Sequence, residues 1–195
     1  MYGPWFDEYH KKYPDRVIGI SEYGCEALDW HSSNPEQGDY TEEYQAFYHE
    51  ELIKQISKRP YLWATHVWNM FDFGAAHRTE GDRPGINDKG LVTHDRKVKK
   101  DAFYFYKANW NPEPMVYIAG HRSVNRVKPV TEVQIFSNCA EVTLKVNGQI
   151  IKKMQPDGVK VCIFKDIRLK KGENNIEVSA KNGKRVITDA CCWIL

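Results

Sequence analysis

The sequence lacks any apolar run close to the roughly 18 residues that a membrane-spanning helix requires. It also lacks a charge excess, because its net charge is +2 and its basic residues are scattered, which gives no reason to expect a nucleic-acid partner. The densest basic run, residues 96–100, is interpreted as a solvated helix start. No phosphate loop, dinucleotide fingerprint or serine elbow is present. We therefore expect no membrane span, no nucleic acid and no nucleotide.

Cysteine and histidine show no arrangement that would hold a metal. The five cysteines follow no metal-binding spacing, and the neighbours Cys191 and Cys192 cannot pair without a strained ring. The histidines show no ligand spacing either. We expect five reduced cysteines, no metal site and no cofactor.

The first part of the chain, residues 1–110, alternates helical patterns with short apolar runs. Helices are predicted over residues 5–13, 41–59 and 99–108, and strands over residues 16–21 and 62–70. Thr41 can cap the second helix, for which we predict an apolar stripe of Tyr44, Phe47, Leu52 and Ile56. This order of elements is typical of an α/β fold with a parallel sheet.

The second part follows the segment Asn111-Pro112-Glu113-Pro114, which cannot continue a helix and is predicted to be a linker. From there the apolar residues recur with period two, and Asn147-Gly148 and Asn182-Gly183 are strong hairpin-turn signals. Several short strands in residues 115–195 indicate an immunoglobulin-like β-sandwich. The predicted fold class is therefore α/β followed by all-β.

Polar and aromatic side chains gather where the two predicted parallel strands end. Glu22 lies at the end of the first strand, Trp68 and Asp72 lie at the end of the second, and a loop with Asn87 and Lys89 follows. The carboxyl ends of parallel strands meet at one edge, where active sites of (β/α) barrels form. A carboxylate, aromatic rings and hydrogen-bonding groups there favour a sugar site, although a solvated loop glutamate and core tryptophans are the plainer interpretation.

Four segments, in the same order and at compatible spacing, resemble the last two β/α units of glycoside hydrolase family 2. This family contains β-galactosidases, β-glucuronidases and β-mannosidases. The segments are Ile20-Ser21-Glu22-Tyr23-Gly24, Thr41-Glu42-Glu43-Tyr44-Gln45, Trp68-Asn69-Met70-Phe71-Asp72-Phe73, and Asn87-Asp88-Lys89-Gly90-Leu91-Val92 with Lys100-Asp101-Ala102 beyond it. Residues 115–195 resemble the immunoglobulin-like domain that follows the barrel in many bacterial β-galactosidases of the family. The resemblance implies strands seven and eight of a TIM (β/α)8 barrel and the domain after it, within a longer polypeptide.

The resemblance also implies catalytic and substrate-binding roles. Glu22 matches the family's nucleophile at the end of strand seven, and Trp68 matches the tryptophan that lines the subsite of the terminal sugar. Asn87 and Lys89 match the Asn-x-Lys pair with which β-glucuronidases grip the substrate carboxylate. Similar stretches occur in members assigned as β-galactosidases, so the pair leaves the substrate open.

Three further residues complete the expected substrate-binding set. They are Tyr23, beside the nucleophile, Trp30, on the loop after the first strand, and Asp72, for which a helix-capping role is about as plausible.

A retaining glycosidase needs a second carboxylate about 5–5.5 Å from the nucleophile. The family places it in an Asn-Glu pair, which this sequence lacks, so we expect the chain alone to be inactive. The first expectation is a segment of an enzyme that hydrolyses terminal β-D-galactosides by double displacement. The alternatives are a β-glucuronidase and a non-catalytic carbohydrate-binding or structural module.

The expected partners are the carbohydrate substrate and the remainder of the barrel with the N-terminal domains of the full-length enzyme. In a bacterium, reduced cysteines favour the cytoplasm slightly over the periplasm or secretion.

Overall fold

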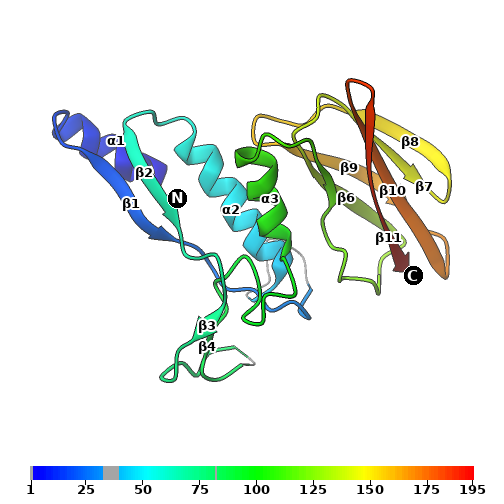
Figure 1. Cartoon of the computed structure of the whole chain (residues 1–195), viewed down its shortest axis with the longest axis horizontal. Coiled ribbons are helices and arrows are strands. Elements are labelled where there is room, and N and C mark those ends of the chain that lie inside the picture. Colours follow the sequence, from blue (N-terminus) through cyan, green and yellow to red (C-terminus); the bar gives the residue numbers. More distant parts are fainter. Residues whose placement is uncertain (1, 33–39, 82) are drawn as a thin grey trace. The chain divides into compact units, whose positions relative to one another are not determined.

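The computed structural model describes residues 2–32, 40–81 and 83–195 of the chain (Figure 1). Contacts divide the chain into two compact units, Met1–Ala102 and Phe103–Leu195. The division falls ahead of the proline-containing segment at residues 111–114. In the described residues, no helix has both the length and the apolar character that crossing a membrane requires.

The first unit contains a parallel strand pair joined through a helix. Its elements are α1 (Gly3–Lys12), β1 (Ile18–Tyr23), α2 (Glu42–Ile56), β2 (Leu62–Val67) and the two-residue strands β3 (Phe73–Gly74) and β4 (Ile86–Asn87). β1 and β2 run parallel, with Ile18 opposite Leu62 and Tyr23 opposite Val67. The prediction of parallel strands is confirmed for this pair, and both strands end at the same edge (Figure 1).

The cap of α2 is confirmed, but of the predicted apolar stripe only Leu52 is buried. The Thr41 side chain accepts a hydrogen bond from the Tyr44 amide at 3.2 Å. The buried residues of the helix are Glu42, Gln45, Ala46, His49, Glu50, Leu52 and Ile53, whereas Tyr44, Phe47 and Ile56 remain partly exposed.

Hydrogen bonds explain why α2 buries polar side chains. Gln45 Nε2 donates to the carbonyl of Cys25 at 3.0 Å and to that of Gly90 at 3.3 Å. Glu42 Oε2 accepts from the Asp101 amide at 2.8 Å. A buried polar group with partners costs far less than one without. A hydrophobicity pattern cannot reveal such a face because its members are polar.

The second unit is a two-sheet β structure preceded by α3 (Asp101–Trp110), whose residues from Phe103 onward belong to it. The strands are β5 (Val116–Ile118), β6 (Val130–Ser137), β7 (Val142–Val146), β8 (Gln149–Met154), β9 (Val161–Arg168), β10 (Glu173–Asn182) and β11 (Arg185–Ile194). One antiparallel sheet has the order β5-β6-β9 and the other β11-β10-β7-β8. A shared apolar core, including Ile135, Leu144 and Trp193, lies between them.

This strand order is that of an immunoglobulin-like sandwich in which β8 pairs with β7. A constant-type immunoglobulin domain instead places its fourth strand in the other sheet. The Asn147-Gly148 hairpin is confirmed: Val146 faces Gln149, and both turn residues have positive φ, 52° and 79°. At the second signal Asn182 pairs with Arg185, so the turn itself lies one residue later than predicted, at Gly183 and Lys184.

α3 packs on the three-stranded sheet through aromatic rings. Phe105 meets Phe136 edge-on at 5.7 Å, and Tyr104 stacks on Tyr117 with ring centroids 3.6 Å apart. Asn109 Nδ2 also donates to the Val159 carbonyl at 2.9 Å. These contacts explain why the division between the units falls in the first turn of α3 rather than after the helix.

Candidate active site

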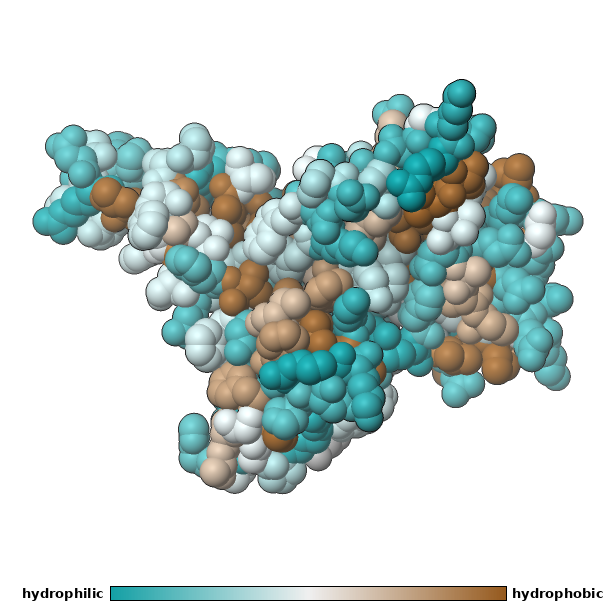
Figure 2. All heavy atoms as spheres, in the orientation of Figure 1, coloured by the Kyte–Doolittle hydropathy of each residue, from teal (hydrophilic) through white to brown (hydrophobic). Residues whose placement is uncertain are grey.

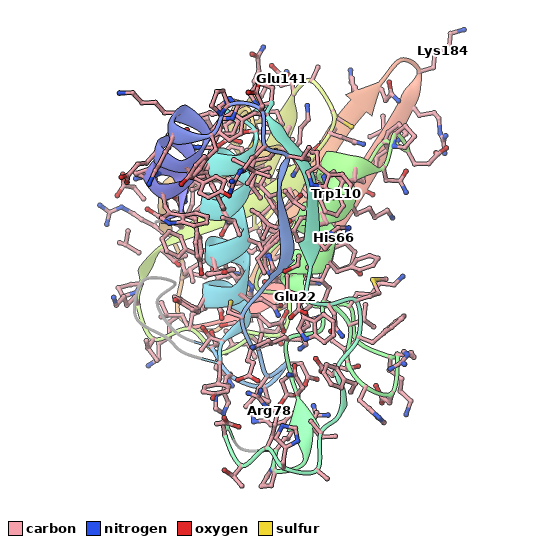
Figure 3. The ribbon with its side chains drawn as sticks, turned by 90° about the vertical axis from the view of Figure 1, so that its left-hand side faces the viewer. Glu22, His66, Arg78, Trp110, Glu141 and Lys184 are labelled. Atoms are coloured by element: carbon pink, nitrogen blue, oxygen red, sulfur yellow. The ribbon has the colours of Figure 1, made fainter. Side chains whose placement is uncertain are left out.

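Glu22 is the penultimate residue of β1, and its side chain is exposed. Figure 3 places it toward the end of the strand pair, beyond His66 of β2. Within the described part of the chain its carboxylate makes no hydrogen bond and no ion pair. The strand therefore presents an open carboxylate at the edge where both parallel strands end.

Trp68 is fixed beside this carboxylate by backbone contacts. The Trp68 amide donates to the Tyr23 carbonyl at 2.8 Å. Gly24 passes so close to Trp68 that a Cβ atom on the glycine would lie 2.1 Å from the Trp68 carbonyl oxygen. The glycine of the Ser-Glu-Tyr-Gly segment thus permits the close approach of the two strand ends. The Trp68 ring is 36% exposed and meets Phe73 edge-on at 5.8 Å.

The loop with Asn87 and Lys89 lies on the other side of Trp68. The Asn69 amide donates to the Lys89 carbonyl at 3.2 Å, and the Leu91 amide donates to the Asn69 carbonyl at 2.9 Å. Asn87 is only 6% exposed. Its Oδ1 accepts from the Lys89 amide at 3.1 Å, and its amide nitrogen donates to no described residue. Three backbone segments thus lie side by side: the one at Tyr23, the one at Trp68 and Asn69, and the one at Lys89. The structure brings Glu22, Trp68, Asn87 and Lys89 to one edge.

Tyr23 does not lie with this group, which corrects the expectation that it binds substrate. Its side chain is only 6% exposed, and its ring centroid is 5.9 Å from that of His49 on α2. Successive strand residues point to opposite faces, so an exposed Glu22 places Tyr23 against the helix. Burial lowers the pKa of His49 to about 3, and its imidazole is therefore neutral near pH 7.

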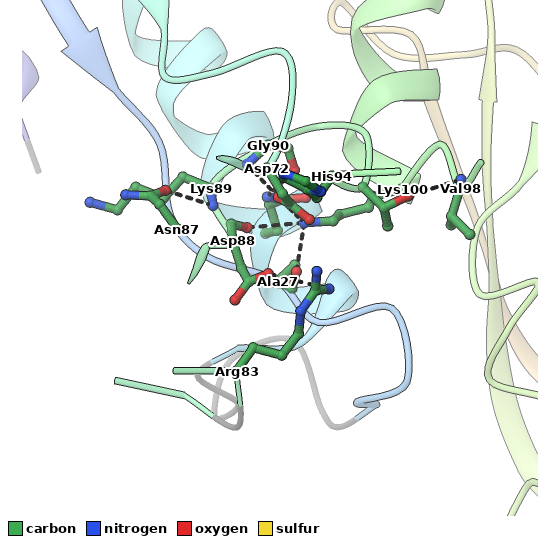
Figure 4. A network of polar contacts seen from close by, with 12 residues as sticks. Ala27, Asp72, Arg83, Asn87, Asp88, Lys89, Gly90, His94, Val98 and Lys100 are labelled. Carbon is green, nitrogen blue, oxygen red and sulfur yellow. Dashed lines mark hydrogen bonds and ion pairs between the residues drawn. The ribbon is translucent and has the colours of Figure 1, made fainter. Parts of the chain in front are cut away.

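Asp72 is also no direct sugar ligand, because its side chain has no exposed surface. Its Oδ1 atom accepts from Lys100 Nζ at 2.8 Å and from the Gly90 amide at 2.9 Å (Figure 4). Burial raises the pKa of Asp72, and the Lys100 ammonium opposes that rise. The carboxylate ties the segment after β2 to the loop that carries Lys89.

Lys100 is the residue that the sequence reasoning missed. The charge pattern predicts a solvated helix start at residues 96–100, but the Lys100 side chain is fully buried. Besides Asp72 it donates to the carbonyls of Ala27, at 2.6 Å, and Asp88, at 3.0 Å. Charge patterning carries no signal for such a lysine, because its partners are backbone oxygens and an aspartate far away in the sequence.

Trp30 lies apart from the strand ends, on the segment after β1. Its ring is 53% exposed, and the Arg83 guanidinium lies 5.5 Å from the ring centroid. Arg83 also lies 3.5 Å from Asp88 Oδ1. Burial raises the pKa of Asp88, and Arg83 acts against this. The Trp30 ring is open to a ligand, and among the described residues its ring contacts are with His31 and Arg83.

Two acidic residues close to Glu22 in sequence or on the following loop are engaged elsewhere. Glu26 pairs with Arg78, and Glu80 lies 3.4 Å from the same guanidinium. In the described ranges no group of three or more His, Cys, Asp or Glu side chains could hold a metal ion. The chemistry available at the edge is one open carboxylate, one exposed indole, one ammonium and one amide.

No protein-family model matches the chain. Among curated proteins, it is 50% identical to a β-glucuronidase of Bacteroides fragilis over 192 residues, which is 95% of this chain and 28% of that protein. Among solved structures, it is similar to an FMN-binding β-glucuronidase from Faecalibacterium prausnitzii L2-6, with 46% identity and a TM-score of 0.90 over 98% of this chain and 29% of that one. It is also similar to a Bacteroides fragilis protein described provisionally as a β-galactosidase, with 33% identity and a TM-score of 0.92 over 98% and 30%. The chain thus spans less than a third of each of these relatives.

Proposed function

The chain belongs to glycoside hydrolase family 2, and we propose that it is the segment of a retaining β-glucuronidase that carries the nucleophile and the residues that recognise the sugar carboxylate. Glu22 is the nucleophile, Trp68 is the platform for the terminal sugar, and Asn87 with Lys89 binds the carboxylate. The observation that carries the proposal is the backbone ladder that places these side chains at one edge.

The chemistry assigned to Glu22 requires an accessible, ionised carboxylate. It attacks the anomeric carbon and forms a glycosyl ester, while a second carboxyl group protonates the departing oxygen and later activates water. The exposed Glu22 side chain satisfies the first requirement. The second carboxyl group is assigned to another part of a longer polypeptide, because the acidic residues Glu26 and Glu80 are held by Arg78.

The preference for a glucuronide follows from the charge at Lys89. A glucuronide differs from a galactoside in the configuration of the C4 hydroxyl and in bearing a carboxylate in place of the hydroxymethyl group. A carboxylate that loses water needs a cation or several donors in return. Lys89 supplies an ammonium, and Asn87 supplies an amide nitrogen that no described residue engages. These two groups suit a carboxylate better than a neutral hydroxymethyl group.

The comparisons with known proteins favour a β-glucuronide over a β-galactoside as the substrate. The galactoside preference expected from the sequence is supported by the relative at 33% identity, which is provisionally described as a β-galactosidase. Relatives at 50% and 46% identity are described as β-glucuronidases. We therefore place the glucuronide first and keep the galactoside as the second candidate.

The proposed segment provides two strands of a (β/α)8 barrel, which needs about 250 residues in all. Trp63 of β2 is 70% exposed and Val17, just before β1, is 75% exposed. Figure 2 shows further apolar surface among hydrophilic residues. We propose that the remaining barrel covers the exposed apolar side chains of the first unit and that the 195-residue chain alone is inactive. The non-catalytic alternative is tested by calorimetry of the isolated chain with galactose and glucuronate and by an activity assay of the longer enzyme on aryl β-glycosides. Sugar binding by the chain, with no hydrolysis by the longer enzyme, would favour that alternative.

The substrate assignment is tested in the longer enzyme by Lys89→Ala. Loss of a hydrogen bond between charged groups costs about 1.5–3 kcal/mol, so kcat/KM for an aryl β-glucuronide should fall by roughly 10- to 150-fold. Hydrolysis of the matching β-galactoside should change little. Lys97→Ala is the control, because Lys97 is 81% exposed and forms only a surface pair with Asp95. Equal losses on both substrates would contradict the assignment.

A further inference from the structure

Three segments of the first unit converge on the Lys100 ammonium. Its Nζ atom donates to Ala27 O, to Asp88 O and to Asp72 Oδ1, at 2.6, 3.0 and 2.8 Å. Ala27 lies five residues after Glu22, Asp72 lies four residues after Trp68, and Asp88 precedes Lys89. An ammonium has three protons to donate, so these three acceptors use its whole capacity.

The contacts bracket Lys89 on both sides. Asp88 O accepts from Lys100 Nζ, and the Gly90 amide donates to Asp72 Oδ1 at 2.9 Å. The Lys89 backbone is itself held at its amide by Asn87 and at its carbonyl by the Asn69 amide. Four hydrogen bonds thus fix the two peptide units on either side of the Lys89 Cα atom, and the direction in which the Lys89 side chain leaves the loop is set with them. In Figure 4 the Lys89 and Asn87 side chains reach away from the cluster.

The ion pair between Lys100 and Asp72 is fully buried, where removing the two charges from water costs the most free energy. Both side chains are fully buried, and Asp72 Oδ2 accepts no hydrogen bond from any described residue. A buried ion pair of this kind is often no more stabilising than a pair of apolar side chains of similar volume. Stability alone is therefore a weak explanation for it, whereas fixing the geometry of a charged recognition group on the adjacent loop is a sufficient one.

We propose that Lys100 and Asp72 are positioning residues for Lys89 and thereby set the preference of the site for a carboxylate-bearing sugar. This proposal rests on the proposed function. Neither residue touches the sugar. They act by holding Asp88 and Gly90 so that the Lys89 ammonium meets the sugar carboxylate, and a small displacement of that ammonium should weaken glucuronides selectively.

Two variants of the longer enzyme test the proposal while limiting the risk of misfolding. Asp72→Asn keeps the shape of the side chain and an acceptor for the Gly90 amide but removes the ion pair. The double variant Asp72→Asn/Lys100→Met leaves no buried charge without a partner. The matched control is Lys97→Met, an exposed lysine three residues before Lys100. Folding is checked by thermal unfolding and by kcat on an aryl β-galactoside.

The expected result is a fall in the ratio of kcat/KM for glucuronide over galactoside, by roughly tenfold to a hundredfold. The fall should appear mainly in KM for the glucuronide, and it should vanish when Lys89→Ala is already present, because the pair acts through Lys89. Equal losses on both substrates would overturn the proposal in favour of a purely structural role. If Lys89→Ala itself leaves the ratio unchanged, the proposed function fails. If Lys89→Ala lowers the ratio but the pair variants do not, only the positioning role fails.

Discussion

The close approach of Gly24 to the Trp68 backbone can be tested by adding one methyl group at residue 24. In Gly24→Ala the new Cβ atom would lie 2.1 Å from the Trp68 carbonyl oxygen, and that neighbour is backbone rather than a movable side-chain end. Relief requires the two strand ends to separate, which strains or breaks the 2.8 Å hydrogen bond from the Trp68 amide to the Tyr23 carbonyl. One hydrogen bond contributes about 1 kcal/mol, and overpacking costs about 1–3 kcal/mol.

We therefore expect Gly24→Ala to lower the free energy of unfolding by about 2–4 kcal/mol. Because the same displacement separates Glu22 from Trp68, kcat/KM should fall about a hundredfold even at temperatures where the variant is folded. Chemical unfolding and steady-state kinetics of the longer enzyme, measured side by side, give the two numbers.

Gly74→Ala is the matched control. A Cβ atom on Gly74 would meet nothing within 4 Å, and that variant should resemble the parent in both assays. If Gly24→Ala unfolds and turns over like Gly74→Ala, the close approach of the two strand ends does not organise the site, and the reasoning fails.

Two further predictions concern stability. The pKa of His49 is lowered by burial from 6.5 to about 3, so in the pH window between these values the unfolded chain binds the extra proton and stability falls as the pH falls; between pH 7 and pH 5 this should cost about 2 kcal/mol, and denaturant unfolding of His49→Gln at both pH values should show that much less pH dependence. An unchanged pH dependence would mean that His49 does not titrate as its burial requires. In the second unit, Phe136 is fully buried beside Phe105 and Tyr117, and Phe136→Ala should cost about 3–5 kcal/mol in urea unfolding. Ile150→Ala, at a residue that is 62% exposed, should stay within about 0.5 kcal/mol, and equal costs for the two variants would refute the assignment of the core.

Local signals in the sequence predicted those elements whose cause is local. The Thr41 cap and the Asn147-Gly148 turn each depend on a few neighbouring residues, and each is confirmed. The parallel pairing of residues 18–23 with residues 62–67 is long-range; it is predicted from the alternation of strands with helices and is also confirmed. Burial on α2 was misjudged because Gln45 and Glu42 are buried through hydrogen bonds to distant backbone groups.

The residues of the candidate site also differ in whether local sequence signals could predict their roles. Glu22, Trp68, Asn87 and Lys89 could be grouped from the sequence because strand ends converge in any parallel sheet. The expectation that Tyr23 binds substrate is wrong because successive strand residues point to opposite faces, and Glu22 takes the exposed one. The roles of Asp72 and Lys100 could not be predicted from the sequence, because they depend on contacts between residues that lie 12 to 73 positions apart.

The central claim is that Glu22 forms a glycosyl ester. An activated 2-deoxy-2-fluoro-β-glucuronide slows the breakdown of such an ester, so the longer enzyme can be labelled, digested and examined by peptide mass spectrometry. The account predicts one added fluoroglycosyl group on the peptide that contains Glu22, and no label in Glu22→Gln. A label on a different carboxylate, or equal labelling of the Gln variant, would contradict it.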